Sequence, residues 1–206
     1  MRRHENSKLV MKPSLILASS SPRRSELLRT LGVSFTVDPA HINEDQLPGE
    51  PALAYVLRLA EEKARAVAVR HPQSYVLGAD TTVVVDGEIL AKPLDAADAM
   101  RMLSLLSGRG HEVITAVSLI SPGVTSSAPH AQADTRSCTT HVYFRKIQEE
   151  EIQSYVAGGE PMDKAGAYAI QGGAAAWAER MEGEYSNVVG LPLPLIAEML
   201  KAQGLI

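Results

Sequence analysis

The chain has 206 residues, of which 45% are hydrophobic and 21% charged, a composition typical of a soluble globular protein with one substantial domain. The net charge of −4 gives no electrostatic basis for nucleic-acid binding, and no apolar run approaches the roughly 18 residues of a membrane span, so we expect neither partner. The single cysteine, Cys138, excludes an internal disulfide and suits a reducing cytoplasm.

Strand-like and helical patterns alternate from the start of the chain. Residues 1–12 are basic but are followed by no apolar signal region, so we expect a flexible tail ahead of a single domain, 13–206. The apolar residues 15–18 predict a first strand. Residues 22–31 predict a helix, with Ser21 as its N-cap and Pro22 as its first helical residue.

The remaining elements follow in the same alternation. Further strands are expected at residues 34–37, 75–79, 111–121, 139–147 and 174–181. Further helices are expected at residues 51–70, 96–107, 148–157 and 195–203. Asp86 and Gly87 lie between apolar residues and predict a hairpin turn, while residues 41–50, 122–134 and 164–173 read as loops. This order indicates an α/β fold.

The first turn of the predicted helix 22–31 carries two arginines, Arg23 and Arg24. Cations are disfavoured there by about 0.3–1 kcal/mol each, because the helix N-terminus carries partial positive charge. A bound anion would offset this cost, and the preceding hydroxyls, including that of Ser19, suit a phosphate or polyphosphate. The alternative, of equal weight on this stretch alone, is an ordinary N-cap followed by two solvated arginines.

A second candidate is Asp80, which follows the predicted buried strand 75–79. A carboxylate there can bind Mg²⁺ or act as a general base toward water, although it could also simply cap a turn. Glu44, Lys63 and Lys92 would each be surface charges if taken alone. Together with the arginines they provide what a metal–polyphosphate complex needs, which is carboxylates for the metal and cations for the phosphates.

The segment DKAGAYAIQGG contains two further candidates. Tyr168 could stack on a base and Gln171 could hydrogen-bond a base edge, whereas the alternative is a glycine-rich turn with a buried tyrosine. His111 and the segment YSNVVGLPL are read as structural. No metal-binding Cys or His motif, Walker loop or serine-hydrolase elbow is present, so the residues favour metal-assisted attack of water on a phosphoanhydride.

These segments resemble the Maf family of nucleoside triphosphate pyrophosphatases, which are also linked to arrest of cell division. The resemblance runs from about Leu15 to the last helix. It rests on SSSPRRSELL, LAEEKA, GADTTV, LSGRGHEVITAV, DKAGAYAIQG and YSNVVGLPL and on the pair Lys92 and Pro93. Each segment is weak evidence alone, whereas the combination is specific.

The resemblance implies an α/β fold similar to that of the inosine-triphosphate pyrophosphatases: a mixed twisted sheet with flanking helices, and two lobes around a cleft. It implies hydrolysis of dTTP and UTP, or of modified pyrimidine nucleotides, to the monophosphate and pyrophosphate. It also implies a divalent cation, Mg²⁺ or Mn²⁺, as cofactor, and it makes a homodimer plausible.

Site residues carry over position by position. Asp80 matches the family's proposed catalytic base, and Asp80 and Glu44 would hold the metal. The phosphate-side positions are Ser19, Arg23, Arg24, Lys63 and Lys92. Base choice is tied to Arg23, Thr81 and Gln171, and KAGAYAIQG resembles the branch that prefers dTTP and UTP to 7-methyl-GTP.

Two departures from the family pattern stand out. Asn43 replaces an acidic residue found in many relatives, which leaves one fewer carboxylate for a metal, and GGAAAW after Gln171 predicts a softer pocket wall. Two other functions remain open. One is a nucleotide-binding regulator of cell division that needs no catalysis. The other is a nucleic-acid-binding protein that uses SPRRS as a basic contact, although the acidic net charge argues against it.

Overall fold

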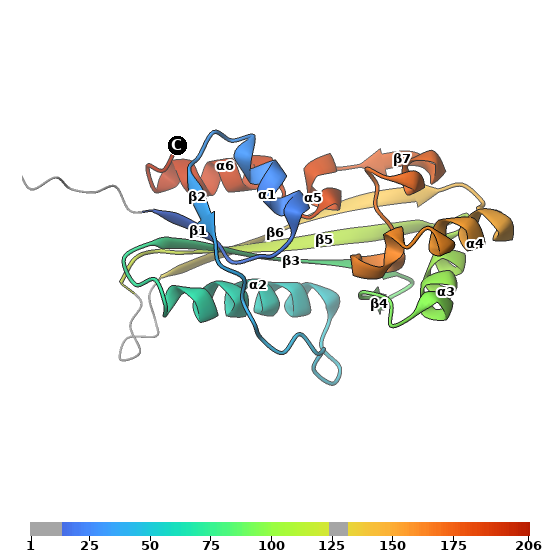
Figure 1. The fold of residues 1–206 in the computed structure, drawn as a ribbon, viewed down its shortest axis with the longest axis horizontal. Coiled ribbons are helices and arrows are strands. Elements are labelled where there is room, and N and C mark those ends of the chain that lie inside the picture. Colours follow the sequence, from blue (N-terminus) through green and yellow to red (C-terminus); the bar gives the residue numbers. More distant parts are fainter. Residues whose placement is uncertain (1–13, 124–131) are drawn as a thin grey trace, which may run out of the picture.

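The structure is an α/β fold built on one long mixed sheet (Figure 1). It is a computed structural model that describes residues 14–123 and 132–206. The strands are β1 (Leu15–Leu17), β2 (Phe35–Val37), β3 (Tyr75–Val85), β4 (Glu88–Leu90), β5 (Gly110–Ile120), β6 (Ala133–Phe144) and β7 (Ala178–Glu182). The helices are α1 (Pro22–Arg29), α2 (Ala52–Ala68), α3 (Ala96–Leu106), α4 (Glu149–Ala157), α5 (Tyr185–Val189) and α6 (Leu193–Ala202). Short 3₁₀ turns cover Glu160–Asp163, Ala165–Ala167 and Gly173–Trp177.

The strands lie in the order β2-β1-β3-β5-β6-β7, and β4 pairs with the far end of β3. β1 runs parallel to β2 and β3, whereas the other neighbours are antiparallel, so the expected mixed sheet is confirmed. Helix α2 covers one face, and α1, α5 and α6 lie on the other (Figure 1). Among the described residues, no helix combines the length and apolar character needed to cross a membrane.

Alternation along β3 decides which side chain faces which helix layer. Leu77 and Ala79 pack in the cluster that contains residues of α1 and α6, while Val76 packs with residues of α2. Asp80 therefore faces α2 and Thr81 faces the opposite layer. Gly78 lets α2 approach closely, because a Cβ at this position would lie 2.3 Å from the carbonyl oxygen of Ala60.

The core is divided along the length of the sheet. Two clusters join β1, the first half of β3 and the end of β5 to α1, α2 and α6. A third packs the first half of α2 against Ile114 and Ala116 in the middle of β5. Another cluster joins the opposite ends of β3, β5 and β6 to α3, α4 and the 3₁₀ turns. The packing thus differs between the two ends of the sheet, and the expected division into two lobes around a cleft stays a prediction.

Several predicted boundaries were wrong. β3 does not end before Asp80 but continues to Val85, because the buried charge of Asp80 is paired with Lys63 and need not leave the sheet. The predicted strand 174–181 begins with the 3₁₀ turn Gly173–Trp177, whose Ala174 and Trp177 enter the core.

One predicted strand is longer than expected. β6 begins at Ala133, within the predicted loop 122–134, because it pairs with β5 as far as Ile120. Residues 124–131 of that loop, and the expected tail 1–12, lie outside the described residues.

Candidate active site

The candidate site lies beside a stretch of β3 that has no neighbouring strand on one edge. β1 pairs with β3 only as far as Leu77, and β4 first pairs at Val83. Within the described chain, no strand lies beside residues 78–82 on this edge, and a cavity of about 550 Å³ opens there. Its lining includes all nine residues predicted for the site: Ser19, Arg23, Arg24, Glu44, Lys63, Asp80, Thr81, Lys92 and Gln171.

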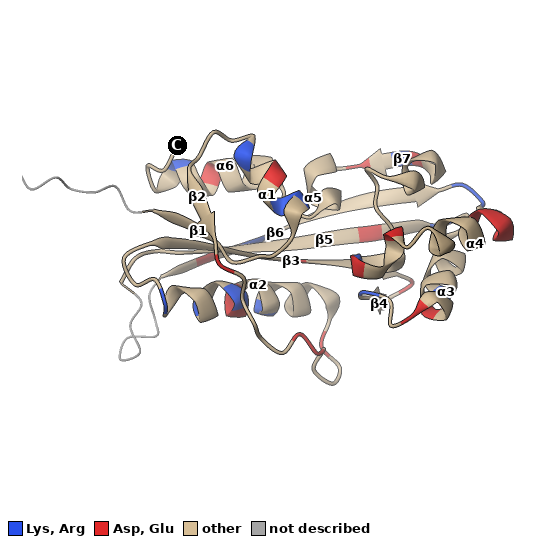
Figure 2. Ribbon diagram, in the orientation of Figure 1, with Lys and Arg blue, Asp and Glu red and all other residues tan. Residues whose placement is uncertain are grey.

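The start of α1 forms one wall of the cavity. Ser21 is the N-cap, as predicted, and its hydroxyl accepts a hydrogen bond from the backbone N–H of Arg24 at 3.4 Å. Pro22 follows in the first turn, and Arg23 and Arg24 both line the cavity. Figure 2 shows this basic start of α1 in blue. No acidic residue lies in this turn to balance the two arginines.

Arg24 is held by protein acceptors. Its Nε donates to the carbonyl of Gly190 at 2.9 Å, and Nη2 donates to the Thr81 hydroxyl at 3.0 Å. Nη1 donates to the carbonyl of Ala79 at 2.8 Å and, more weakly, to the Ser19 hydroxyl at 3.4 Å. These contacts use four of the five guanidinium N–H groups, so Arg24 offers a fixed positive charge rather than an open fork. Burial lowers the pKa of Arg24, although Asp80 and Glu44 oppose that shift.

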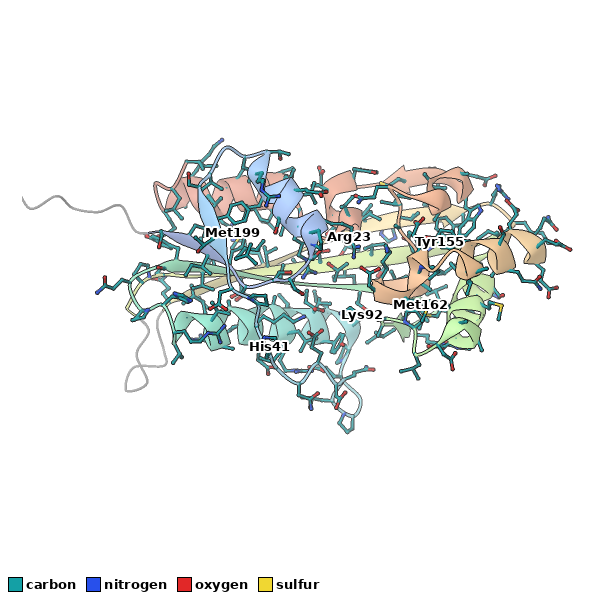
Figure 3. All side chains as sticks on the ribbon, in the orientation of Figure 1. Arg23, His41, Lys92, Tyr155, Met162 and Met199 are labelled. Carbon is teal, nitrogen blue, oxygen red and sulfur yellow. The ribbon has the colours of Figure 1, made fainter. Side chains whose placement is uncertain are left out.

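Arg23 and Lys92 are more accessible to a ligand. Arg23 Nη1 pairs with Asp163 at 3.0 Å, an exposed carboxylate on the other side of the cavity. Lys92 makes no hydrogen bond or ion pair with any residue of the described ranges. Figure 3 shows Arg23 on the α1 side of the sheet and Lys92 on the side of β4. An anion in the cavity would meet cations from both sides.

Lys63 joins the two candidate metal ligands. Its Nζ lies 2.6 Å from Asp80 Oδ1 and 2.9 Å from Glu44 Oε2. Burial raises the pKa of Asp80, although Lys63 and Arg24 oppose the shift. Partial burial alone would raise the pKa of Glu44 as well, but Lys63, Lys92 and Arg24 together bring it below its usual value.

The loop that carries Glu44 is anchored on α2. The Tyr55 hydroxyl donates to the carbonyl of Glu44 at 2.9 Å. Arg58 donates to both carboxylate oxygens of Glu50 at 2.7 Å and to the carbonyl of Asp45 at 3.1 Å. The backbone carbonyls of Glu44 and Asp45 are therefore both fixed, in a loop whose Glu44 side chain reaches Lys63.

Part of the cavity lining is apolar. This part includes Val83, Val113, Ala165, Ile170, Val188 and Val189. Tyr168 also lines the cavity but is a core residue: it is buried, and its hydroxyl lies 2.8 Å from His111 Nε2. This confirms the buried-tyrosine reading and the structural role expected for His111. Gln171 is exposed at the cavity and forms no hydrogen bond within the described ranges.

Some functional groups were missed from the sequence. Asp163 lies in DKAGAYAIQG, but nothing in that segment indicated its pairing with Arg23. The carbonyls of Ala79 and Gly190 leave no signature in the sequence. The segment YSNVVGLPL, read as a structural turn, contains α5 and supplies one of these carbonyls. Thr82, which the sequence allows either as a hydroxyl contact or as a plain strand former, also lines the cavity; its buried hydroxyl has no partner among the described residues.

The donor set can be tested against a divalent metal. Within the described ranges, no group of three or more His, Cys, Asp or Glu side chains is arranged to hold one. Glu44 and Asp80 nevertheless converge on a single cation, the ammonium of Lys63. Mg²⁺ commonly takes one or two carboxylates and completes its shell with substrate phosphates and water, so this pair fits a metal that arrives with a nucleotide.

Comparisons with known proteins show the family of this chain. The family model described as Maf-like protein matches residues 14–203, which include the whole cavity lining. The chain belongs to the Maf family. Relatives from Citrifermentans bemidjiense and Koribacter versatilis, both described as dTTP/UTP pyrophosphatase, are 51% and 49% identical to it; each match covers 93% of this chain, and 96% and 95% of theirs. A third, from Anaeromyxobacter dehalogenans, has the same description and is 52% identical over 94% of this chain and 96% of its own.

A solved structure is also similar to this Maf-family chain. The structure of the Staphylococcus aureus Ham1 protein has a TM-score of 0.48 and 14% sequence identity, and the match covers 92% of this chain and 99% of that one. This TM-score is too low to support an argument. The likeness to the inosine-triphosphate pyrophosphatases therefore stays a prediction, whereas the α/β class and the mixed sheet rest on the strands themselves.

Proposed function

We propose that this Maf-family chain hydrolyses dTTP and UTP to the monophosphate and pyrophosphate. The observation that carries the proposal is the cavity at the gap in the sheet. Its cationic lining residues, Lys63, Lys92 and the two arginines of α1, suit a triphosphate, and its apolar lining residues suit a base. The descriptions of relatives about half identical to this chain, over nearly its whole length, support the same activity.

Asp80 is the proposed general base. Burial raises its pKa, so its carboxylate is a stronger proton acceptor than an exposed one. The hydrogen bond from Lys63 orients it. In the proposed reaction, Asp80 accepts a proton from the attacking water, and pyrophosphate leaves as the phosphoanhydride bond breaks.

The cations bind and orient the triphosphate. Lys92 and Arg23 can rotate onto phosphate oxygens. Lys92 makes no hydrogen bond or ion pair in the described chain, and Arg23 pairs only with the exposed carboxylate of Asp163. Arg24 stays in place and contributes charge close to Asp80. The Ser19 hydroxyl, weakly bound to Arg24, can turn to a phosphate.

We also propose a divalent cation, Mg²⁺ or Mn²⁺, held by Glu44 and Asp80. When bound, it would neutralise phosphate charge and polarise the bond that breaks. Glu44 would then leave the ammonium of Lys63, which could turn toward the phosphates while it keeps its hydrogen bond to Asp80. Asn43 does not replace the missing carboxylate: its Oδ1 accepts from the backbone N–H of Asp45 and shapes the loop.

Base choice is proposed for Gln171, because its amide offers one donor and one acceptor to a pyrimidine edge. The roles of Arg23 and Thr81 in that choice remain proposals taken from the family. A softer wall after Gln171 receives no support: the lining reaches Gln171, and residues 172–177 do not belong to it. A homodimer, a cytoplasmic location and a part in cell-division arrest are likewise proposals.

Replacing the base tests the proposal. Asp80→Asn should abolish pyrophosphate release and still bind dTTP, because the phosphate-side cations remain. Asp86→Asn is a matched control: Asp86 lies in the β3–β4 turn, pairs with Arg109 at the surface, and has a positive φ that asparagine tolerates. Full activity in Asp80→Asn would rule Asp80 out as the base. A cellular effect on division that survives in this variant would instead favour the regulator.

A further inference from the structure

A buried hydroxyl lies behind the cavity without touching it. Thr115 on β5 pairs in register with Thr81 on β3 and is completely buried. Its Oγ1 lies 2.9 Å from Thr81 Oγ1 and 2.9 Å from the backbone carbonyl oxygen of Asn187. Thr81 in turn accepts from Arg24. A chain of hydrogen bonds thus runs from the cavity wall to α5.

The direction of these bonds is fixed. A carbonyl oxygen only accepts, so Thr115 must use its single proton on Asn187. Thr115 is then an acceptor toward Thr81, which must donate its own proton to Thr115. Thr81 can therefore meet Arg24 only as an acceptor, which is what a guanidinium N–H requires. Each hydroxyl has one possible orientation, and bonds aligned in this way strengthen one another.

A second arm closes the chain into a ring. Arg24 Nε donates to the carbonyl of Gly190, whose own N–H donates to the carbonyl of Asn187 at 3.0 Å. Both arms from the guanidinium therefore end on the same buried oxygen. Gly190 has a φ of 116°, and a Cβ there would lie 3.4 Å from Thr81 Oγ1 and 3.6 Å from Arg24 Nε.

Asn187 is fixed to the sheet from its other side. The residue is completely buried, and its side-chain amide donates to the carbonyl of Val113 at 2.9 Å and to the Thr140 hydroxyl at 3.0 Å. Thr140 uses its own proton on the carbonyl of Glu184, so it can only accept from Asn187. The oxygen on which the ring ends is thus anchored to both β5 and β6.

We propose that Thr115 is a positioning residue for the hydrolysis proposed above: through Thr81 and the carbonyl of Asn187 it holds the guanidinium of Arg24 in its working orientation. The role in catalysis rests on the proposed function, whereas the effect on Arg24 does not. Thr115 touches no part of the cavity and is not a catalytic residue. Thr81 then serves to hold Arg24, because its proton is not available to a substrate.

The test compares Thr115→Val, which keeps the shape and removes the hydroxyl, with Thr115→Ser, which restores it. Ser118→Ala is the matched control, because Ser118 is an equally buried hydroxyl on β5 that bonds Thr135 and lies outside the ring. The first readout is hydrogen exchange of the Arg24 Nε–H, followed by ¹⁵N NMR of the full chain and assigned with Arg24→Lys. The second is kcat/KM for dTTP.

We expect Thr115→Val to speed Arg24 Nε–H exchange at least ten-fold and to lower kcat/KM roughly ten-fold, equal to about 1.4 kcal/mol. Thr115→Ser should stay within about three-fold of the wild type, and Ser118→Ala within about two-fold. Unchanged exchange in Thr115→Val, or an equal change in Ser118→Ala, would overturn the proposal. If Thr115→Val does not fold, Thr115→Ala replaces it. If the wild type hydrolyses no nucleotide, the proposed function fails, and the exchange rates still decide whether Thr115 holds Arg24.

Discussion

Removing the ammonium of Lys63 should leave a buried carboxylate without its counter-charge. Lys63 and Asp80 are only 7% and 6% exposed, and their charged atoms lie 2.6 Å apart. Lys63→Met keeps the length of the side chain and its packing on β3 while it removes the charge. Glu44 also loses an ion pair, but its half-exposed carboxylate can turn to water.

The size of the effect follows from this geometry. At an effective dielectric constant of about 20, two unit charges 2.6 Å apart attract by about 6 kcal/mol, and much of this offsets their removal from water. Removing one partner of such a pair costs about 3–5 kcal/mol, because the other charge stays buried. In a domain of this size each kcal/mol lowers Tm by about 2–4 °C, so Lys63→Met should lower Tm by about 6–20 °C.

Urea unfolding of a double-mutant cycle isolates this pair. Lys63→Met should cost much less in an Asp80→Asn background, with a coupling free energy of at least about 2 kcal/mol. Lys92→Met is the control: Lys92 has no partner in the described chain, so its loss should change stability by less than about 0.5 kcal/mol.

The pH dependence has a definite sign. Burial raises the pKa of Asp80, and removing Lys63 should raise it further. For an acid with a raised folded-state pKa, the stability contribution is present at low pH and is lost as the pH rises through that value. The defect of Lys63→Met should therefore shrink on acidification. An equal loss in both backgrounds at every pH would refute this account of the pair.

Three further predictions concern the surroundings of the site. Burial lowers the pKa of His111 to about 4, below the unfolded-state value of about 6.5. The free energy of unfolding of the wild type should therefore fall by about 3 kcal/mol as the pH is lowered between these two values. If it falls no more steeply with pH than that of His111→Gln, measured by urea unfolding, the prediction is contradicted. Gly78→Ala should push α2 away from β3, lower the free energy of unfolding by at least about 2 kcal/mol in urea and reduce hydrolysis. A variant that unfolds like the wild type would contradict the clash with Ala60. Gly190→Ala should lower kcat/KM for dTTP at least ten-fold, because alanine is strained at this positive φ and its Cβ would crowd Arg24. Full activity would show that this turn does not determine the position of the Arg24 guanidinium.

Local chemistry explains what the sequence predicted correctly. Ser21 before Pro22 indicated the start of α1, and Asp86 and Gly87 indicated the β3–β4 turn. Each of these signals needs only neighbouring residues. The continuity of β3 through Asp80 could not be predicted in this way, because Asp80 stays within the strand through a partner 17 residues earlier in the chain.

The composition of the site was more predictable than its geometry. The resemblance to the family named all nine predicted residues that line the cavity, eight of them within its motifs and Glu44 outside them. The motifs did not show that Arg24 is held by the carbonyls of Ala79 and Gly190, because any residue can supply a backbone carbonyl. Nor did they show that Lys63 bridges both carboxylates, a contact that depends on how closely α2 packs on β3.

The most direct test of the central claim is product analysis with the purified chain. dTTP, UTP, CTP, GTP and 7-methyl-GTP would each be offered with Mg²⁺ or Mn²⁺, and pyrophosphate would be assayed separately from phosphate. The account predicts pyrophosphate and the monophosphate from dTTP and UTP. Hydrolysis of 7-methyl-GTP instead would contradict the role given to Gln171, and no pyrophosphate from any nucleotide, in protein shown to be folded, would contradict the proposed function itself.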